Sequence, residues 1–209
     1  MVALLTPVVK ALFTDLGFES TNLALQVHGG HGYIVEHGME QLLRDARIAM
    51  IYEGTNGVQA LDLVGRKLPA NMGRSLRRFF QPVAKFIAAH EREPQIGPLV
   101  QAFAESFGAL QVATSLVIQT GSVDPEEAGA AATEYLRMFG LVALGFMWVR
   151  MAKIAVDALP GTEQDAAFYR AKRATATFYI QRILPQAGAL LHAIQAGKAS
   201  ITAPEEAAF

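Results

Sequence analysis

Apolar residues recur along most of this chain at the three- and four-residue spacing of an amphipathic helix. No stretch shows the sustained alternation of apolar and polar positions that is typical of a strand. The clearest helical pattern lies at 75–92, where one apolar stripe is flanked by basic side chains. The stripe consists of Leu76, Phe79, Phe80, Val83, Phe86 and Ile87. The pattern therefore predicts an all-α protein.

Glycine, proline and capping residues suggest where the helices begin and end. The predicted helices cover 2–27, 38–46, 56–68, 75–92, 99–120, about 125–159 and about 163–196. The first is one helix or two, with Gly17 as its weak point, and Gly121 should end the fifth. We expect Pro82 to kink one helix and Pro185 to bend or split another. Thr162, with Asp165 three residues later, resembles a capping box in which Asp replaces the usual Glu.

The chain is unusually apolar for its 209 residues, with 52% hydrophobic residues and a mean hydropathy of +0.25. Either the core is large, or something outside this chain covers part of its apolar surface. The most apolar run, 138–149, lies between Arg137 and Arg150. Twelve residues are too few to span a bilayer, so we interpret this run as part of a buried core helix and expect no transmembrane segment.

Charge and cysteine content exclude some functions. The formal net charge is -1, which argues against a nucleic-acid binder. The chain has no cysteine, so disulfides and thiolate metal sites are impossible, and a reducing cytoplasm is the location we expect. His28, His31 and His37 lie in a glycine-rich break without a suitably spaced carboxylate, so we expect no metal site.

The character of the sequence changes near residue 70. Before it, glycine- and histidine-rich loops interrupt the helices; after it, the chain is typical of a plain helical bundle. We therefore expect two domains, 1–70 and 71–209, with a boundary in the stretch LPANMG at 68–73.

The first candidate for function is the stretch QVHGGHGY, residues 26–33. Closely spaced glycines let the backbone approach a ligand, and successive N–H groups in such a turn can bind an anion. The alternative is an ordinary helix C-terminus with a left-handed glycine. The spacing leaves both interpretations open.

The second candidate is RDARIAMIYEGTN, residues 44–56, in which Glu53 follows an apolar run and precedes Gly54. A carboxylate among apolar residues is expected to have a raised pKa, which suits a general base. Gly54 leaves room for a substrate, and Thr55 offers a hydroxyl at a helix N-terminus. The alternative is a solvated glutamate that favours the helix dipole.

Taken together, these two stretches resemble the C-terminal domain of the acyl-CoA dehydrogenases over residues 1 to about 68. The paired glycines, the Arg-Asp-Ala, the Tyr-Glu-Gly-Thr and the spacing between them carry the likeness. The stretch EGTNGVQALDLVGRKL is similar to the branch of the family that has an additional C-terminal helical domain, which would be formed here by 71–209. The expected fold is thus a helical C-terminal domain followed by a second helical bundle.

The resemblance implies a reaction in which FAD takes a hydride from an acyl-CoA thioester and a base takes the α-proton, giving a trans-2-enoyl-CoA. Glu53 matches the catalytic base. Gly54 and Arg66 match positions near the substrate. The positions that match contacts to FAD are Gln26, Val27, His28, Gly29, Gly30 and Thr55, the first five of them to the FAD of a neighbouring subunit. One departure is Gly57, where the family often has a glutamine.

The resemblance also implies partners and missing parts. The family's enzymes are flavoproteins of fatty-acid β-oxidation that form dimers or tetramers and pass electrons to an electron-transferring flavoprotein. They hold the flavin and the acyl-CoA in preceding domains that nothing in this sequence could form. We therefore expect this chain to be the last third of a longer enzyme and to be inactive alone. An acyl-CoA oxidase, or a non-catalytic helical interaction module derived from the family, are the alternatives, and the sequence does not indicate the length or branching of the acyl chain.

Overall fold

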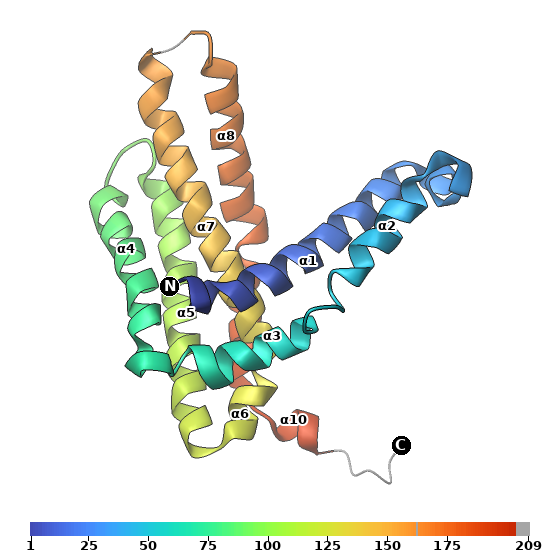
Figure 1. Cartoon of the computed structure of the whole chain (residues 1–209). Helices are drawn as coiled ribbons and strands as arrows, with labels where there is room; N and C mark the ends of the chain where they lie inside the picture. Colours follow the sequence, from blue (N-terminus) through green and yellow to red (C-terminus); the bar gives the residue numbers. More distant parts are fainter. Residues whose placement is uncertain (162, 204–209) are drawn as a thin grey trace.

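The computed structural model describes residues 1–161 and 163–203 and is built from helices joined by short turns (Figure 1). No strand occurs among these residues, so the all-α prediction is confirmed. Thr162, predicted as a capping residue, and residues 204–209 of the predicted second domain lie outside the described residues.

The first two α-helices form an antiparallel pair that extends away from the rest of the molecule (Figure 1). Helix α1 covers Val2–Val27 and continues through Gly17 without a break, and α2 covers Met39–Ile48. Two 3₁₀ turns, Gly29–Tyr33 and Val35–His37, connect them. The buried residues of α1 all lie in its first half, which crosses the bundle, and none lies in the projecting half.

The predicted helix over 56–68 is a composite. Helix α3 covers Asn56–Asp62, a π-helical turn follows at Leu63–Lys67, and a 3₁₀ turn at Ala70–Gly73 leads into the next helix. Thr55 is the N-cap of α3, and its hydroxyl oxygen accepts a hydrogen bond from the Val58 N–H at 3.3 Å. The sequence pattern located the helix, while the wider π turn at its end was not predicted.

Helices α4, Arg74–His90, and α5, Gly97–Val123, match the predicted helices over 75–92 and 99–120. Pro82 lies inside α4, where Leu76, Phe79 and Val83 of the predicted stripe are buried. The prediction that Gly121 ends α5 is wrong, because the helix runs on to Val123 before the Asp124 turn. The close approach of Ala128 to Gly121 explains a glycine there: a Cβ would meet the Ala128 Cβ at 2.7 Å.

The helix predicted over 125–159 is divided at Ala131 into α6, Pro125–Ala130, and α7, Ala132–Ala158, which ends in a 3₁₀ turn at Leu159–Gly161. Helix α7 is long and apolar enough to cross a membrane by length and composition alone. It lies instead at the centre of the bundle, in contact with α1, α5, α8 and α9, and half of its most apolar window is buried. The interpretation of 138–149 as part of a core helix agrees with this placement.

The last predicted helix is split as Pro185 suggested. Helix α8 covers Ala166–Phe178 and continues in a π turn at Tyr179–Ile183, and α9 covers Gln186–Gln195 beyond the proline. A short helix, α10, follows at Ala199–Thr202. The proline ring cannot continue the hydrogen-bond ladder, which is why the helix axis is interrupted there.

One hydrophobic core includes residues from both predicted domains. Leu4 and Val8 of α1 belong to the same buried cluster as Phe79 of α4 and Phe139 of α7. The expected division at 68–73 coincides with the turn before α4, and whether either part folds alone stays a prediction. The shared core means that removing one part would expose apolar surface of the other.

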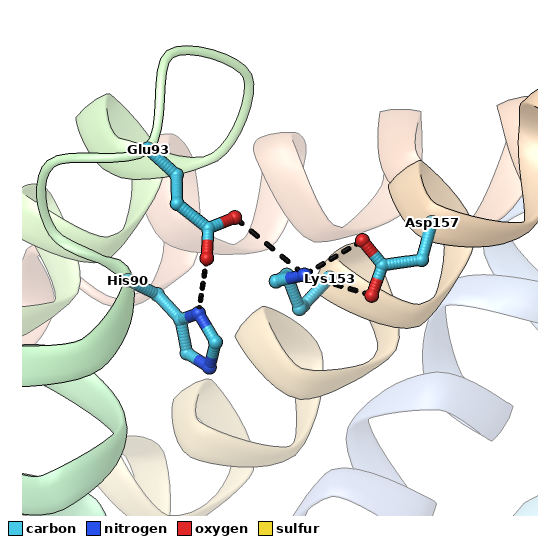
Figure 2. Close-up of polar contacts among 4 residues, drawn as sticks. All are labelled: His90, Glu93, Lys153 and Asp157. Atoms are coloured by element: carbon cyan, nitrogen blue, oxygen red, sulfur yellow. Dashed lines mark hydrogen bonds and ion pairs between the residues drawn. The ribbon is translucent and has the colours of Figure 1, made fainter.

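A polar cluster fastens the α4–α5 turn to α7 (Figure 2). Glu93 lies between His90 and Lys153. Its Oε1 is 2.6 Å from His90 Nδ1, and its Oε2 is 3.5 Å from Lys153 Nζ. The same ammonium group lies 2.6 Å from Asp157 Oδ1. Hydrogen bonding to His90, together with the charge of Lys153, lowers the pKa of Glu93.

Candidate functional site

The loop between α2 and α3 carries Glu53 in an unusual backbone conformation. Glu53 has a φ of 57°, and Gly54, which follows it, has a φ of 85°. A left-handed conformation costs a residue with a side chain about 1–2 kcal/mol, whereas glycine adopts it readily. A Cβ at Gly54 would also lie 2.8 Å from Gln59 Nε2. Surrounding contacts must therefore hold Glu53 in place.

Lys10 on α1 supplies one of these contacts. Its Nζ donates hydrogen bonds to the Gly54 carbonyl oxygen and to Asn56 Oδ1, both at 2.8 Å. Lys10 is half-buried, and its neighbours Val8 and Ala11 are buried in the core. The ammonium group thus connects the loop to a rigid part of α1.

Asn56 supplies the second connection to α1. Its Nδ2 donates to Asp15 Oδ1 at 2.6 Å and to the Ala11 carbonyl oxygen at 3.2 Å, and it lies 3.0 Å from Thr14 Oγ1. The amide oxygen of the same side chain accepts from Lys10. Both ends of the Asn56 amide are therefore used between α1 and the start of α3.

Gln59 on α3 completes the arrangement. Its Nε2 donates to the Glu53 carbonyl oxygen at 3.2 Å. The carbonyl oxygens of the two left-handed residues, Glu53 and Gly54, thus each accept a hydrogen bond from a side chain on a neighbouring helix. This satisfies backbone groups that the turn itself leaves without a ladder partner.

The side chain of Glu53 is exposed in this chain. The sequence suggested that the apolar run before it would exclude water, but Ile51 and Tyr52 are themselves 48% and 52% exposed. The run forms a turn on the surface of the molecule, so its side chains do not fold over the carboxylate. The described residues therefore position Glu53 but do not desolvate it.

The glycine-rich turn lies at the other end of α2 from Glu53 (Figure 1). Gly29 has a φ of 59° and ends α1, as expected of an ordinary left-handed C-terminal glycine. Residues 26–30 are all exposed, and α2, with its 10 residues, extends about 15 Å between this turn and the Glu53 loop. The structure thus separates the two predicted groups of cofactor contacts within one chain.

These surface positions fit a flavin held jointly with other protein segments. A Cβ at Gly30 would meet no atom within 4 Å, and Val27 is 87% exposed, so both offer open surface. Thr55 is exposed at the N-terminus of α3. Such open, partly apolar positions can form one wall of an enclosed ligand site but do not enclose a ligand by themselves.

Arg66 lies near the end of the α3 segment, in the π-helical turn, with 77% of its side chain exposed. Its Nε donates a hydrogen bond to Asp62 Oδ1, and Lys67 Nζ lies 3.5 Å from the other carboxylate oxygen. The hydrogen bond from Arg66, with the charge of Lys67, lowers the pKa of Asp62. Arg66 is thus accessible to an anionic ligand but already shares its charge with a carboxylate.

His28, His31 and His37, which the sequence analysis considered as metal ligands, do not form a metal site in the described residues. The rings of His31 and His37 pack edge to face with centroids 5.4 Å apart. No group of three histidine, aspartate or glutamate side chains able to hold an ion occurs in 1–161 and 163–203. The expectation of no metal stays a prediction for the whole chain.

Two family models match the chain on either side of the α3–α4 turn. Residues 3–68 match the acyl-CoA dehydrogenase C-terminal domain, and residues 79–204 match the model described as acetyl-CoA dehydrogenase C-terminal like. The chain belongs to the acyl-CoA dehydrogenase family, of which it matches the C-terminal part.

Similar proteins carry related names. The chain is 37% identical to 3-methylmercaptopropionyl-CoA dehydrogenase of Ruegeria pomeroyi over 90% of this chain and 32% of that protein. It is 29% identical to a butyryl-CoA dehydrogenase of Syntrophomonas wolfei over 99% of this chain and 34% of that protein. The chain is 28% identical to a broad-specificity linear acyl-CoA dehydrogenase of Mycobacterium tuberculosis over 99% of this chain and 35% of that protein. The chain therefore spans about a third of the length of these relatives.

Three residues that hold the Glu53 loop were not predicted from the sequence: Lys10, Asn56 and Gln59. One signal was present for the first, since Lys10 is the lone charge in the apolar stretch from Val2 to Phe13. A charge inside an apolar helical segment needs a partner, and the partner here is a loop more than forty positions away. Sequence spacing alone could not identify that loop.

Proposed function

We propose that this chain is the C-terminal part of an FAD-dependent acyl-CoA dehydrogenase in which Glu53 removes the α-proton of an acyl-CoA thioester. The observation that carries the proposal is the left-handed Glu53, φ 57°, in a loop whose two carbonyl oxygens are held by side chains of α1 and α3. Backbone strain that is maintained by dedicated contacts is concentrated at functional sites.

The chain's own residues contribute position and proton acceptance. The carboxylate of Glu53 takes the proton from the α-carbon, while Gly54 leaves space beside it for the substrate. FAD, when bound, supplies the acceptor for the hydride that leaves the β-carbon. Thr55 and the N–H groups at the start of α3 would lie towards the cofactor, with Gln26 to Gly30 contacting the cofactor of a neighbouring subunit.

Parts of the enzyme beyond this chain would complete the surroundings of the base. Glu53 is exposed here, and a carboxylate in water is a weak base for the α-proton of a thioester. Docking of preceding domains and substrate against the exposed Ile51 and Tyr52 would remove that water.

The names of the relatives suggest a thioester of coenzyme A with a short or linear acyl group as the substrate. Arg66, which is exposed on the same composite helix, would contact the anionic CoA portion. An electron-transferring flavoprotein would take the electrons onward, in a pathway such as β-oxidation. An acyl-CoA oxidase would use the same base but pass the electrons to oxygen.

The projecting α1–α2 arm supports assembly into a dimer or tetramer. Val27, Tyr33 and Val35 at its far end are 71–87% exposed, which is a large apolar exposure for a surface turn. The expected contact of this turn with a neighbouring subunit's cofactor would cover these side chains. Light scattering of the full-length enzyme should therefore show an oligomer, and a strict monomer at high concentration would contradict this part of the proposal.

The test is Glu53→Gln in the full-length enzyme, because glutamine keeps the shape but cannot accept the proton. We expect retained FAD, retained acyl-CoA binding, and flavin bleaching on substrate addition that slows by at least about a hundredfold. Glu105→Gln, at an exposed position on α5, is the matched control and should bleach at the parental rate. Parental bleaching by Glu53→Gln would show that another residue takes the proton. Oxygen uptake by the parental enzyme would identify the oxidase alternative.

A further inference from the structure

The lysine of α1 has an unusual set of partners. Lys10 donates both of its observed hydrogen bonds to neutral oxygens, the Gly54 carbonyl and Asn56 Oδ1. In the part of the chain that the structure describes, no carboxylate lies within salt-bridge distance of it. Burying an ammonium group costs free energy unless strong partners compensate. A half-buried lysine that donates to a loop carbonyl rather than to a carboxylate is therefore unusual.

The partners of Lys10 lie next to Glu53 on the C-terminal side. The Gly54 carbonyl fixes the peptide plane that follows Gly54, and Gln59 holds the carbonyl of Glu53 itself. Two successive left-handed residues define the direction in which the Glu53 side chain leaves the backbone. If the Gly54 carbonyl were released, Glu53 could relax to a commoner conformation and its carboxylate would move.

The support behind Lys10 is rigid. Leu4, Val8 and Leu12 on the same half of α1 are at most 2% exposed. Asn56 bonds both to Lys10 and to Asp15, which lies about one turn further along α1. The loop is therefore held at two points along the same helix. Positions fixed by packed helices are more accurate than positions within a loop.

We propose that Lys10 is a positioning residue for the base: through the Gly54 carbonyl and Asn56, it holds Glu53 in the orientation needed for proton removal. The inference rests on the proposed function, since it concerns the same reaction. In this role Lys10 acts through the loop rather than by contact with substrate or cofactor. A displacement of about 1 Å in a catalytic group can slow a reaction about a hundredfold, so the loss of such an anchor is measurable.

The experiment uses the full-length enzyme with bound FAD and measures flavin bleaching by stopped flow with butyryl-CoA. Lys10→Met keeps the length and apolar stem of the side chain but removes the donor. We expect bleaching about 10- to 100-fold slower, with retained FAD and a KM changed by less than about threefold. Lys10→Arg keeps a donor and should restore most of the rate. Lys85→Met, at an exposed position on α4, is the matched control and should bleach at the parental rate.

A double variant separates positioning from any other role. If Lys10 acts through Glu53, then Glu53→Gln with Lys10→Met should be no slower than Glu53→Gln alone, because a base that is absent cannot be misplaced. If the two losses multiply, Lys10 acts elsewhere and the inference is overturned. Asn56→Ala gives a second variant, with the same expected behaviour, should Lys10→Met fail to retain FAD.

The outcomes distinguish this inference from the proposed function. Parental bleaching by both Lys10→Met and Asn56→Ala, with slow bleaching by Glu53→Gln, overturns the positioning role and leaves the base assignment intact. Parental bleaching by Glu53→Gln overturns the base assignment, and the positioning inference with it. Slow bleaching by all three single variants without multiplication supports both.

Discussion

Leu12 on α1 lies directly against Gly140 on α7, so that a Cβ on the glycine would be 2.6 Å from Leu12 Cδ2. Cβ and Cγ of the same leucine would lie only 3.2 Å from it. Leu12 is 1% exposed and cannot move aside easily. This contact joins the helix that carries Lys10 to the central helix of the C-terminal bundle.

Gly140→Ala should destabilise the chain. Overpacking a core costs about 1–3 kcal/mol, while replacing a helical glycine with alanine returns at most about 1 kcal/mol. The thermal unfolding midpoint should therefore fall by several degrees. Gly108→Ala on α5 is the control, since a Cβ there meets no atom within 4 Å, and its midpoint should stay or rise. Equal midpoints for the two variants would show that α1 and α7 are less closely packed than the structure has them.

Phe79→Asp should unfold the bundle. Phe79 is 5% exposed, and its ring lies 5.1 Å from that of Phe139 between ring centroids. Loss of the buried ring, together with burial of a charge, should cost more than about 3 kcal/mol. Phe178→Asp, at a position 58% exposed, should change the unfolding midpoint little. Circular dichroism during heating measures both, and an unchanged midpoint in Phe79→Asp would remove this ring from the core.

Much of the fold follows from local sequence signals. The stripe at Phe79 and Val83 predicted the buried face of α4, and Pro185 predicted the interruption between α8 and α9. The errors concern places where tertiary contact overrides the local signal. Gly121 is a packing glycine against Ala128 rather than a helix end, and Ala131, with no breaking tendency of its own, separates α6 from α7.

The candidate site was predicted in part. The sequence placed Thr55 at a helix N-terminus, and Thr55 is the N-cap of α3, because a cap depends on neighbours in sequence. The role of Glu53 as the base stays a prediction. The anchors Lys10 and Gln59 were not predicted, since their roles depend on where the loop lies in space. The sequence left open whether Glu53 is covered by the apolar residues before it or is solvated, and in the described residues it is exposed.

The cluster around Glu93 should make stability depend on pH. The hydrogen bond to His90 and the charge of Lys153 lower the pKa of Glu93 below its ordinary 4.5. A group whose pKa is lower in the folded state contributes stability above its unfolded pKa and loses it as the pH falls through the folded value. Glu93→Gln should therefore reduce stability at pH 7 and flatten the decline below about pH 4.5, as urea unfolding at several pH values would show. Glu105→Gln should keep the parental pH profile.

The stability that Lys153 contributes in the same cluster should be lost at alkaline pH. Hydrogen bonding to Asp157, with the charges of Asp157 and Glu93, raises the pKa of Lys153 above its ordinary 10.5. A lysine whose pKa is higher in the folded state stabilises the fold fully at pH values below its unfolded-state pKa. This stabilisation is lost as the pH rises through its folded-state pKa. Lys153→Met should thus remove stability throughout the neutral range. The double variant should lose less stability than the sum of the losses in Glu93→Gln and Lys153→Met. If the two losses of unfolding free energy add, the two groups do not interact as Figure 2 shows.

Arg66 and Asp62 should affect substrate binding in opposite directions. In the full-length enzyme, Arg66→Gln should raise the KM for acyl-CoA by about fivefold, because an exposed ion pair contributes only modestly to binding. Asp62→Asn should lower the KM, because the carboxylate no longer competes for the guanidinium group. Neither change should alter kcat much, since neither residue is expected to contact the reacting carbons. A rise in KM from both variants would point to a folding effect, and steady-state kinetics over a range of ionic strength would separate the charge contribution.

The chain alone should neither retain FAD nor act on acyl-CoA. Glu53, Gly54 and Thr55 are exposed, and residues 26–30 lie at the far end of α2, so one chain offers two separate surfaces rather than an enclosed site. Tight binding of a cofactor needs a pocket that buries most of its surface. After incubation with FAD and gel filtration, the protein peak should show no visible absorption from flavin. The full-length enzyme, treated alike, is the control and should carry flavin. Flavin eluting with the chain at near-equal stoichiometry would mean that these helices form a complete site, and that the preceding domains are not needed to hold the cofactor.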